Sequence, residues 1–122
     1  MPLSPNERPL YEVKANLFKG LAHPLRIRIL ELLSASPEVS VAVLQEETGL
    51  ANPHLSQHLA VLRRHRLVVS ERRASHVFYR LADGRTAQLL AVARALLLGI
   101  LEADGALLDE ARGLPDVAGS AG

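Results

Sequence analysis

The chain has 122 residues, which is the size of one domain, and its hydrophobic content of 48% is ordinary for a globular protein. It contains no cysteine, so disulfides, thiol catalysis and cysteine metal ligands are excluded. No apolar stretch reaches the roughly 18 residues of a membrane span, and the opening MPLSPNERP lacks the apolar core of a signal peptide. We therefore expect a single domain that works in the cytoplasm.

Basic residues are concentrated in one part of a chain whose formal net charge is only +1. Residues 1–53 carry five bases and six acids, a net charge of −1. Residues 54–80 carry six arginines and one glutamate, a net charge of +5, and residues 81–122 carry three arginines and six acids, a net charge of −3. Such a cluster is typical of a surface that contacts phosphate, and the alternative is a solvated face with a chance grouping of arginines.

The first third of the chain predicts two helices behind a flexible lead-in of residues 1–8. Apolar residues at helical spacing predict the first helix over residues 10–21. Pro24 opens the second helix, because proline suits the first helical position, and His23 is expected to cap or pack against it. Residues 34–40 are expected to form a connection.

The stretch VSVAVLQEETGLANPHLSQHLAVLRRHRLV predicts two further helices joined by a tight turn. Gly49 ends the first of them, Asn52 is a preferred N-cap for the second, and Pro53 suits its first position. The second helix carries one apolar stripe, formed by Leu55, Leu59 and Leu62. A helix that is buried on this stripe and polar on its other face suits the major groove of DNA.

Two β-like segments follow, over residues 67–71 and 76–81, and flank Arg72 and Arg73. They predict a basic two-stranded β-wing. A long helix is then predicted over residues 84–112, and residues 113–122 are expected to be a disordered tail. The fold class that these elements predict is mainly α, an α+β winged helix, with one domain over residues 9–112 and a helix flanking the motif at each end.

The polar face of the second motif helix and the wing supply the candidate DNA contacts. Short polar side chains near the start of the helix are expected to contact bases or adjacent phosphates: Asn52, His54, Ser56, Gln57 and His58. His58 is equally suited to a structural role. Basic side chains farther along are expected to neutralise phosphates: Arg63, Arg64, Arg72, Arg73 and His76.

The last predicted helix is apolar on more than one face, which is more than a small domain can cover. We therefore expect a homodimer formed through the first and last helices, with a monomer that buries the helix internally as the alternative. The candidate interface residues are Tyr11, Leu17, Phe18, Leu89, Val92, Ala93, Leu96, Leu97, Ile100 and Leu101; Leu107 and Leu108 extend the same apolar pattern.

The segments LFKGLAHPLRIRILELL, VSVAVLQEETGLANPHLSQHLAVLRRHRLV and RRASHVFYRL, within residues 17–81, resemble the ArsR/SmtB family of bacterial winged-helix transcriptional regulators. The resemblance implies a homodimer that binds a pseudo-palindromic operator, acts as a repressor and responds to an effector. The chain departs from the family in the wing, where Ala74-Ser75 replaces the usual glycine-containing turn, and at Arg66, which stands where glycine is usual.

The metal sites of the family are also missing. Ser40-Val41-Ala42 stands where metal-sensing members carry Cys-Val-Cys, and the last helix has none of the histidine ligands that other members use. No cofactor is therefore identified. A nickel or zinc site built from histidines, carboxylates or a partner protein remains as an alternative, with its ligand residues unknown.

An enzyme and a protein-binding module are the two other functional classes. Ser56 and His58 lie too close together on one helix to act as a nucleophile and an independently oriented base, so we expect no enzyme. A winged helix that binds a protein instead of an operator is the second alternative. Its binding would not weaken steeply with salt, whereas binding to DNA would.

Overall fold

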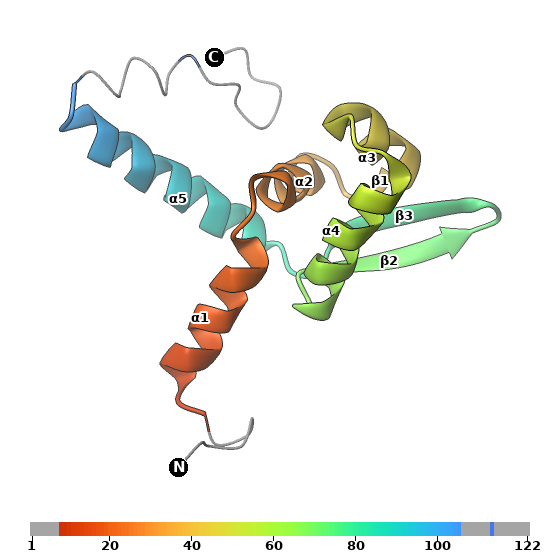
Figure 1. Cartoon of the computed structure of the whole chain (residues 1–122), viewed down its shortest axis with the longest axis horizontal. Helices are drawn as coiled ribbons and strands as arrows, with labels where there is room; N and C mark the ends of the chain where they lie inside the picture. The colour runs from red at the N-terminus through yellow and green to blue at the C-terminus, as the bar shows by residue number, and fades with distance from the viewer. Residues whose placement is uncertain (1–7, 106–112, 114–122) are drawn as a thin grey trace.

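The computed structural model describes residues 8–105 and residue 113. Five helices and a small antiparallel sheet make up this part of the chain (Figure 1). In chain order the elements are α1 (Leu10–Leu21), α2 (Pro24–Ser34), β1 (Val39–Ser40), α3 (Val41–Thr48), α4 (Asn52–Arg64), β2 (Val68–Arg73), β3 (His76–Leu81) and α5 (Arg85–Glu102).

Local capping explains where α2 and α3 begin and where α3 ends. His23 caps α2, as the sequence predicts, because its Nδ1 accepts a hydrogen bond of 3.1 Å from the backbone N–H of Leu25. Ser40 caps α3 by accepting from the backbone N–H of Val43 at 3.2 Å. Gly49 ends α3 with φ of 68°, a left-handed conformation that glycine adopts without a steric penalty.

The predicted N-cap of α4 is wrong by one residue. Ala51 is the N-cap, and its carbonyl accepts hydrogen bonds of 3.1 Å from the backbone N–H groups of both His54 and Leu55. Asn52 is therefore the first helical residue and Pro53 the second, a position at which proline is still tolerated. Since no side chain caps α4, the amide of Asn52 is not used in capping and lies exposed.

The sheet has three strands in the order β1-β3-β2, where the sequence predicts a two-stranded wing. Its extra strand, β1, lies inside the segment that was expected to be a connection and pairs Val39 with Tyr79 and Ser40 with Phe78. A two-residue strand carries too little pattern to be seen in sequence. Strand β2 also begins and ends later than predicted, because its pairing with β3 extends to Arg73 opposite His76.

Two residues without glycine's freedom adopt left-handed backbone conformations. Arg66, directly after α4, has φ of 60°, and Ala74, in the two-residue turn of the wing, has φ of 56°. These are the two positions at which the sequence departs from a glycine pattern. Both side chains therefore lie in a backbone region that favours glycine, which adds local strain.

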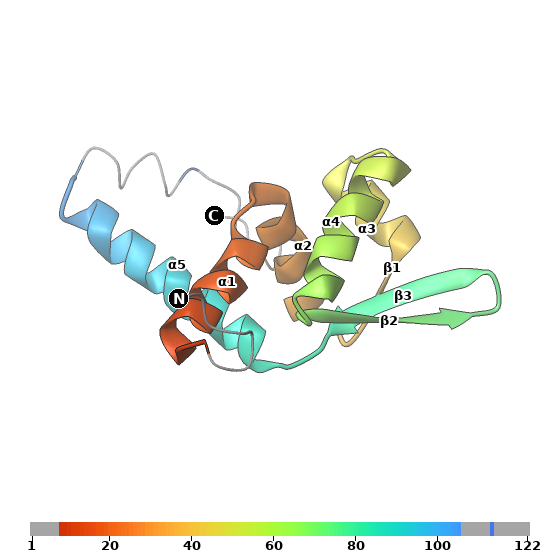
Figure 2. The same cartoon turned by 60° about the horizontal axis from the view of Figure 1, so that its bottom comes forward.

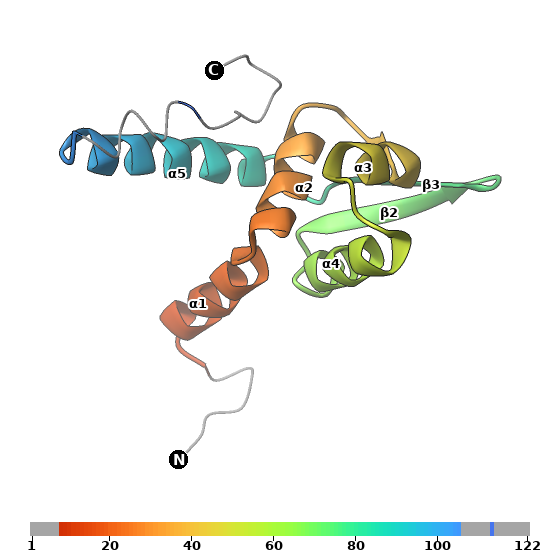
Figure 3. The same cartoon turned by 45° about the horizontal axis from the view of Figure 1, so that its top comes forward.

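The core lies around α2, which packs against α1, α3, α4, α5 and β3. Its buried residues are Leu21, Ile29, Leu30, Leu33, Leu44, Leu55, Leu59, Leu62, Leu67, Val68 and Tyr79. Helices α1 and α5 extend away from this body on one side, while the hairpin of β2 and β3 extends on the opposite side (Figures 1, 2 and 3). The recognition motif and the projecting helices are thus at different ends of the molecule.

The last helix is shorter than predicted. Its start is fixed by Asp83, whose Oδ1 accepts from the backbone N–H of Arg85 at 2.8 Å. The side-chain hydrogen bonds from Arg85 are the main cause that lowers the pKa of Asp83 to about 2, and this backbone bond lowers it further. Helix α5 ends at Glu102, and residues 103–105 form a turn in which Gly105 disfavours further helix. The predicted continuation over residues 106–112, with Leu107 and Leu108, lies outside the described residues.

The predicted chain ends also lie almost wholly outside the described residues. Of the lead-in only residue 8 is described, and of the tail only residue 113. Within the described ranges, no helix is long and apolar enough to cross a membrane.

Candidate nucleic-acid interface

Helix α4 is held on one side and exposed on the other. Leu55 and Leu62 are fully buried and Leu59 is 3% exposed, so the apolar stripe that the sequence predicts does anchor the helix. The predicted contact residues on its far side are exposed, with the exception of half-buried His58: Asn52, His54, Ser56, Gln57, Arg63 and Arg64. The helix thus presents a polar surface that begins at its N-terminus, where short side chains meet free backbone N–H groups.

His58 lies at the boundary between this surface and the body. Its ring contacts that of His23, with ring centroids 4.3 Å apart and the planes tilted by 47°. Burial is the main cause that lowers the pKa of His58, and the neighbouring His23, Arg26 and His54 lower it further. His58 therefore joins α4 to the start of α2 in addition to bordering the polar face.

The two arginines of the wing are in different environments. Arg73 pairs with Glu38 and with Glu71, the latter at 3.4 Å, and its guanidinium lies 4.0 Å from the ring centroid of Phe78. The hydrogen bond to Glu38 is the main cause that raises the pKa of Arg73 above its usual value. Arg72 is one strand position away, so its side chain points to the other face of the hairpin.

On that other face, a hollow of about 460 Å³ separates α4 from the wing. It is lined by four of the predicted DNA contacts, Asn52 and Ser56 from α4 and Arg72 and His76 from the wing. Of these, His76 pairs with Arg73 across the hairpin, and its ring lies on the Arg73 face with its centroid 6.4 Å from that of Phe78. The remaining lining residues are Ser40, Val41, Ala42, Leu59, Ser75, Val77 and Tyr79. Hydroxyl, amide and guanidinium donors around one concave surface suit an anionic backbone.

The other predicted contacts lie outside this hollow. Arg63 crosses toward β2, where its Nη1 donates to Ser70 Oγ at 3.4 Å. Arg64 borders a separate hollow against α1 together with Lys14. His54 and Gln57 are exposed on α4 itself. The predicted phosphate contacts therefore form several groups instead of one continuous stripe.

Sequence reasoning missed two features of this surface. Ser75 joins the hollow from the turn of the wing, and Glu38 supplies the counter-charge to Arg73. Glu38 is 35 positions away from Arg73 in the chain, and only the pairing of β1 with β3 brings the two together. The signal that could have found it is the strand β1, which is too short to be recognised.

The candidate dimer residues differ in exposure. Most are exposed in the single chain, with Tyr11 72%, Phe18 51%, Val92 65%, Leu96 63%, Leu97 52% and Ile100 58% exposed. Ala93 is exposed as well, whereas Leu17, Leu89 and Leu101 are half-buried. Leu10 and Val13, which were not predicted, add to the exposed apolar face of α1. In the described residues no group of three or more histidine, cysteine or acidic side chains could hold a metal ion.

Comparison with known proteins decides the family. A family model described as a helix-turn-helix domain matches residues 21–71. The uncharacterized HTH-type transcriptional regulator Rv0081 of Mycobacterium tuberculosis is 44% identical over 104 residues, which is 85% of this chain and 91% of that protein. The crystal structure of Rv0081 has a TM-score of 0.73 at 45% identity and covers 80% of this chain and 98% of that one.

A further solved structure carries a family name. The homodimeric winged helix-turn-helix domain of Mb0332 from Mycobacterium bovis, described as a possible ArsR-family regulator, has a TM-score of 0.71 at 29% identity, over 82% of this chain and 92% of that one. This chain belongs to the ArsR/SmtB family. The biofilm growth-associated repressor of Agrobacterium fabrum is also similar, with 41% identity over 90 residues, 74% of this chain and 75% of that protein.

Membership of the ArsR/SmtB family confirms the mainly helical winged-helix fold and the resemblance seen in the sequence. It also identifies the protein as a DNA-binding transcriptional regulator and not an enzyme.

Proposed function

We propose that this ArsR/SmtB protein is a transcriptional repressor that binds a pseudo-palindromic operator as a homodimer. The observation that carries the proposal is the two-sided exposure of α4. Its leucine stripe is buried, while its polar face is exposed beside the basic wing. Such a helix can enter the major groove without leaving the body of the domain. The protein would act in the cytoplasm, where a bacterial operator is found.

The exposed apolar faces of α1 and α5 support the dimer. Side chains as large as Tyr11, Phe18 and Leu96 are more than half exposed in the single chain. Covering them with a second copy removes this apolar surface from water, and a two-fold axis lets the same face serve both copies. Two recognition helices in such a dimer would meet successive major grooves about 34 Å apart.

Within this proposal the residues of α4 and the wing have separate tasks. Asn52, His54, Ser56 and Gln57 contact base edges or nearby phosphates, and His58 contributes chiefly by fixing α4 against α2. The remaining candidates bind phosphates: Arg63, Arg64, Arg72 and His76, with a smaller share for the paired Arg73.

The decisive experiment compares Gln57→Ala on operator DNA and on random DNA, using an operator selected from a random-sequence pool. A base contact predicts a loss of about 1 to 3 kcal/mol on the operator and a much smaller loss on random DNA. Gln88→Ala, at an exposed glutamine of α5, is the matched control and should bind as the wild type does. Equal losses on both DNAs for Gln57→Ala would assign this side chain to backbone positioning.

The effector is proposed to be something other than a thiophilic metal. The chain has no cysteine, and arsenite, cadmium and Cu(I) need thiolate ligands for tight binding. Nickel, zinc or cobalt could use histidines and carboxylates, and a small molecule or partner protein is the other source of a response. Operator-bound protein should therefore keep its DNA when it is titrated with arsenite or Cu(I), and stoichiometric release at micromolar concentration would contradict this proposal.

A further inference from the structure

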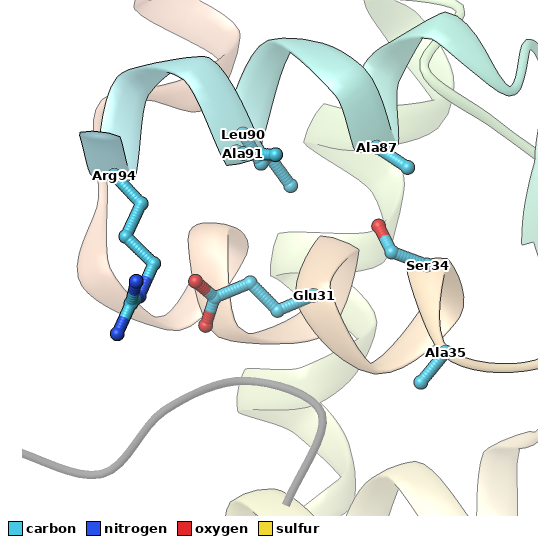
Figure 4. Close-up of a pocket in the computed structure, with 7 residues that line it drawn as sticks. All are labelled: Glu31, Ser34, Ala35, Ala87, Leu90, Ala91 and Arg94. Atoms are coloured by element: carbon cyan, nitrogen blue, oxygen red, sulfur yellow. The ribbon is translucent and has the colours of Figure 1, made fainter. Parts of the chain in front are cut away.

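A small pocket lies between α2 and α5 (Figure 4). Its volume is about 180 Å³, and its wall is mainly apolar. The residues that line it are Ala35, Ala87, Leu90 and Ala91, with Glu31, Ser34 and Arg94 as the polar members. Glu31 and Arg94 reach toward each other from the two helices at one end, while Ser34 faces Ala87 at the other (Figure 4).

The polar groups of the pocket define the chemistry of a ligand. The hydroxyl of Ser34 donates to the carbonyl of Leu30 at 2.7 Å, so its oxygen can offer lone pairs only. Glu31 adds carboxylate acceptors and Arg94 adds guanidinium donors, and each has capacity for more than one hydrogen bond. The two charges cancel, so a charged ligand would bring an unbalanced charge against an apolar wall. A neutral group that both donates and accepts, such as a hydroxyl or an amide, fits this set.

The volume limits the size of the ligand. Pockets for drug-sized molecules measure roughly 300 to 1,000 Å³, and this pocket is smaller, at about 180 Å³. Its occupant is therefore a compact molecule with an apolar body, of the size of a substituted benzene ring.

The pocket lies on a different face of α5 from the proposed dimer contact. Ala87, Leu90, Ala91 and Arg94 are spaced by three and four residues and share the face that meets α2. Leu96 lies about half a turn away from Ala87 around the helix, at the centre of the exposed apolar face. A dimer formed through that exposed face would leave the pocket uncovered.

Helix α2 connects the pocket with the recognition helix. Its C-terminal half supplies Glu31 and Ser34 to the pocket, and the residue that caps its N-terminus, His23, contacts His58 of α4. Between these points Ile29 and Leu30 are fully buried in the core. A displacement of α2 relative to α5 would therefore be transmitted to α4, because the packed core between them leaves little free space.

We propose that the pocket between α2 and α5 binds a small neutral molecule with an apolar body and one hydroxyl or amide group. Binding of this molecule lowers the affinity of the dimer for DNA. The regulatory half of this inference rests on the proposed function. The binding half concerns the free protein and does not depend on it.

The binding half is tested by NMR titration of the full-length, isotope-labelled chain with four probes of similar size. The neutral probes are p-cresol and benzamide, and the charged probes are benzoate and benzylammonium. We expect saturable shifts for the neutral probes at the amides of α2 and α5 that line the pocket, with weaker binding of both charged probes. Failure of both neutral probes to saturate, or shifts centred elsewhere, would overturn the assignment.

Two matched substitutions test the location. Ala91→Leu fills the pocket and should weaken p-cresol binding by at least about tenfold, or 1.4 kcal/mol. Ala60→Leu places the same side chain at an exposed alanine of α4, outside the pocket, and should bind p-cresol within about twofold of the wild type. Thermal unfolding of both variants checks that they are folded. Equal p-cresol affinity in the two folded variants would exclude this pocket.

The regulatory half is tested by measuring operator affinity with and without saturating p-cresol. Coupled sites typically change each other's affinity by a factor of about 5 to 150, and Ala91→Leu should abolish the effect of p-cresol. If operator affinity is unchanged when p-cresol saturates the pocket, the regulatory half alone is overturned. Absence of any operator binding would instead contradict the proposed function and leave the binding site standing.

Discussion

At the scale of single residues, Arg72 and Arg73 show how adjacent identical side chains acquire different roles. The strand alternation directs Arg72 to the hollow beside α4, while Arg73 is held by Glu38, Glu71 and the ring of Phe78. A guanidinium that already has two carboxylate partners gains less from a phosphate, because it must share or give up those contacts. The two arginines should therefore differ in their contribution to DNA binding.

Salt titration of DNA binding measures that difference. Each neutralised phosphate makes the slope of log affinity against log salt steeper by about 0.9. Because a dimer carries each substitution twice, Arg72→Ala should reduce the magnitude of the slope by about 2, and Arg73→Ala should reduce it by less than about 1. Glu38→Gln, which releases Arg73, should steepen the slope. If Arg72→Ala and Arg73→Ala reduce the magnitude of the slope equally, the pairing of Arg73 with Glu38 does not affect DNA binding.

His58 predicts a dependence of folding stability on pH. Its pKa is lowered in the folded chain by burial and by His23, Arg26 and His54, so folding favours the neutral ring. The stabilisation is therefore fully present above the unfolded pKa of about 6.5 and is lost as the pH falls below that value and through the lower folded pKa.

Chemical denaturation between pH 7.5 and 5 provides the measurement. As the pH decreases, the free energy of unfolding of the wild type should decrease more steeply than that of His58→Gln, which cannot titrate at this position. Gln57→Ala removes no titratable group and should keep the pH profile of the wild type. Parallel profiles for wild type and His58→Gln would show that the histidine contact does not respond to protonation.

At the scale of elements, the predicted helices were largely correct because each has a sequence signal of its own. Pro24 and Gly49 mark boundaries, and the leucine spacing of α4 fixes its buried face. The third strand and the true N-cap of α4 had no such signal. Strand β1 exists only through its pairing with β3, and the cap shifted because the carbonyl of Ala51 takes both first-turn hydrogen bonds.

The candidate site could be predicted in its residue types but not in its grouping. Asn52, Ser56, Arg72 and His76 meet at one hollow because the hairpin folds back beside α4, which is a tertiary arrangement. The counter-charge from Glu38 and the pocket beside Arg94 depend on the same kind of long-range packing. A pattern within one helix or strand contains no information about either.

The wing turn offers a test of stored strain. Ala74 has φ of 56°, where a side chain costs about 1 to 2 kcal/mol, while glycine in an element costs about 0.5 to 1 kcal/mol in chain entropy. Ala74→Gly should therefore raise the free energy of unfolding by about 0.5 to 1 kcal/mol. Ala103→Gly, at φ of −68°, has no strain to relieve and should be neutral or destabilising. Denaturant unfolding of both variants measures these changes in the free energy of unfolding. An Ala74→Gly chain that is less stable than the wild type would contradict the prediction.

At the scale of the whole molecule, α1 and α5 project from the body of the domain (Figure 2). Their large apolar side chains are left exposed by the described residues. Leu96→Asp should place an unpaired carboxylate in the proposed dimer contact, which costs several kcal/mol. Because Leu96 is 63% exposed in the single chain, the variant should fold and sediment as a monomer. Gln88→Asp, at a polar position of the same helix, should remain dimeric. An intact dimer in Leu96→Asp at low micromolar concentration would assign the apolar face of α5 another role.

The placement of the aromatic side chains makes the molecule its own optical reporter. The chain has no tryptophan and two tyrosines, so its ultraviolet emission comes from Tyr11 and Tyr79. Tyr11 is 72% exposed on α1, whereas Tyr79 is 7% exposed in the core. Tyr11→Phe would leave a signal from the core alone, and Tyr79→Phe a signal from the projecting helix alone. Unlabelled protein can thus be followed by fluorescence through association and through unfolding as two separate events.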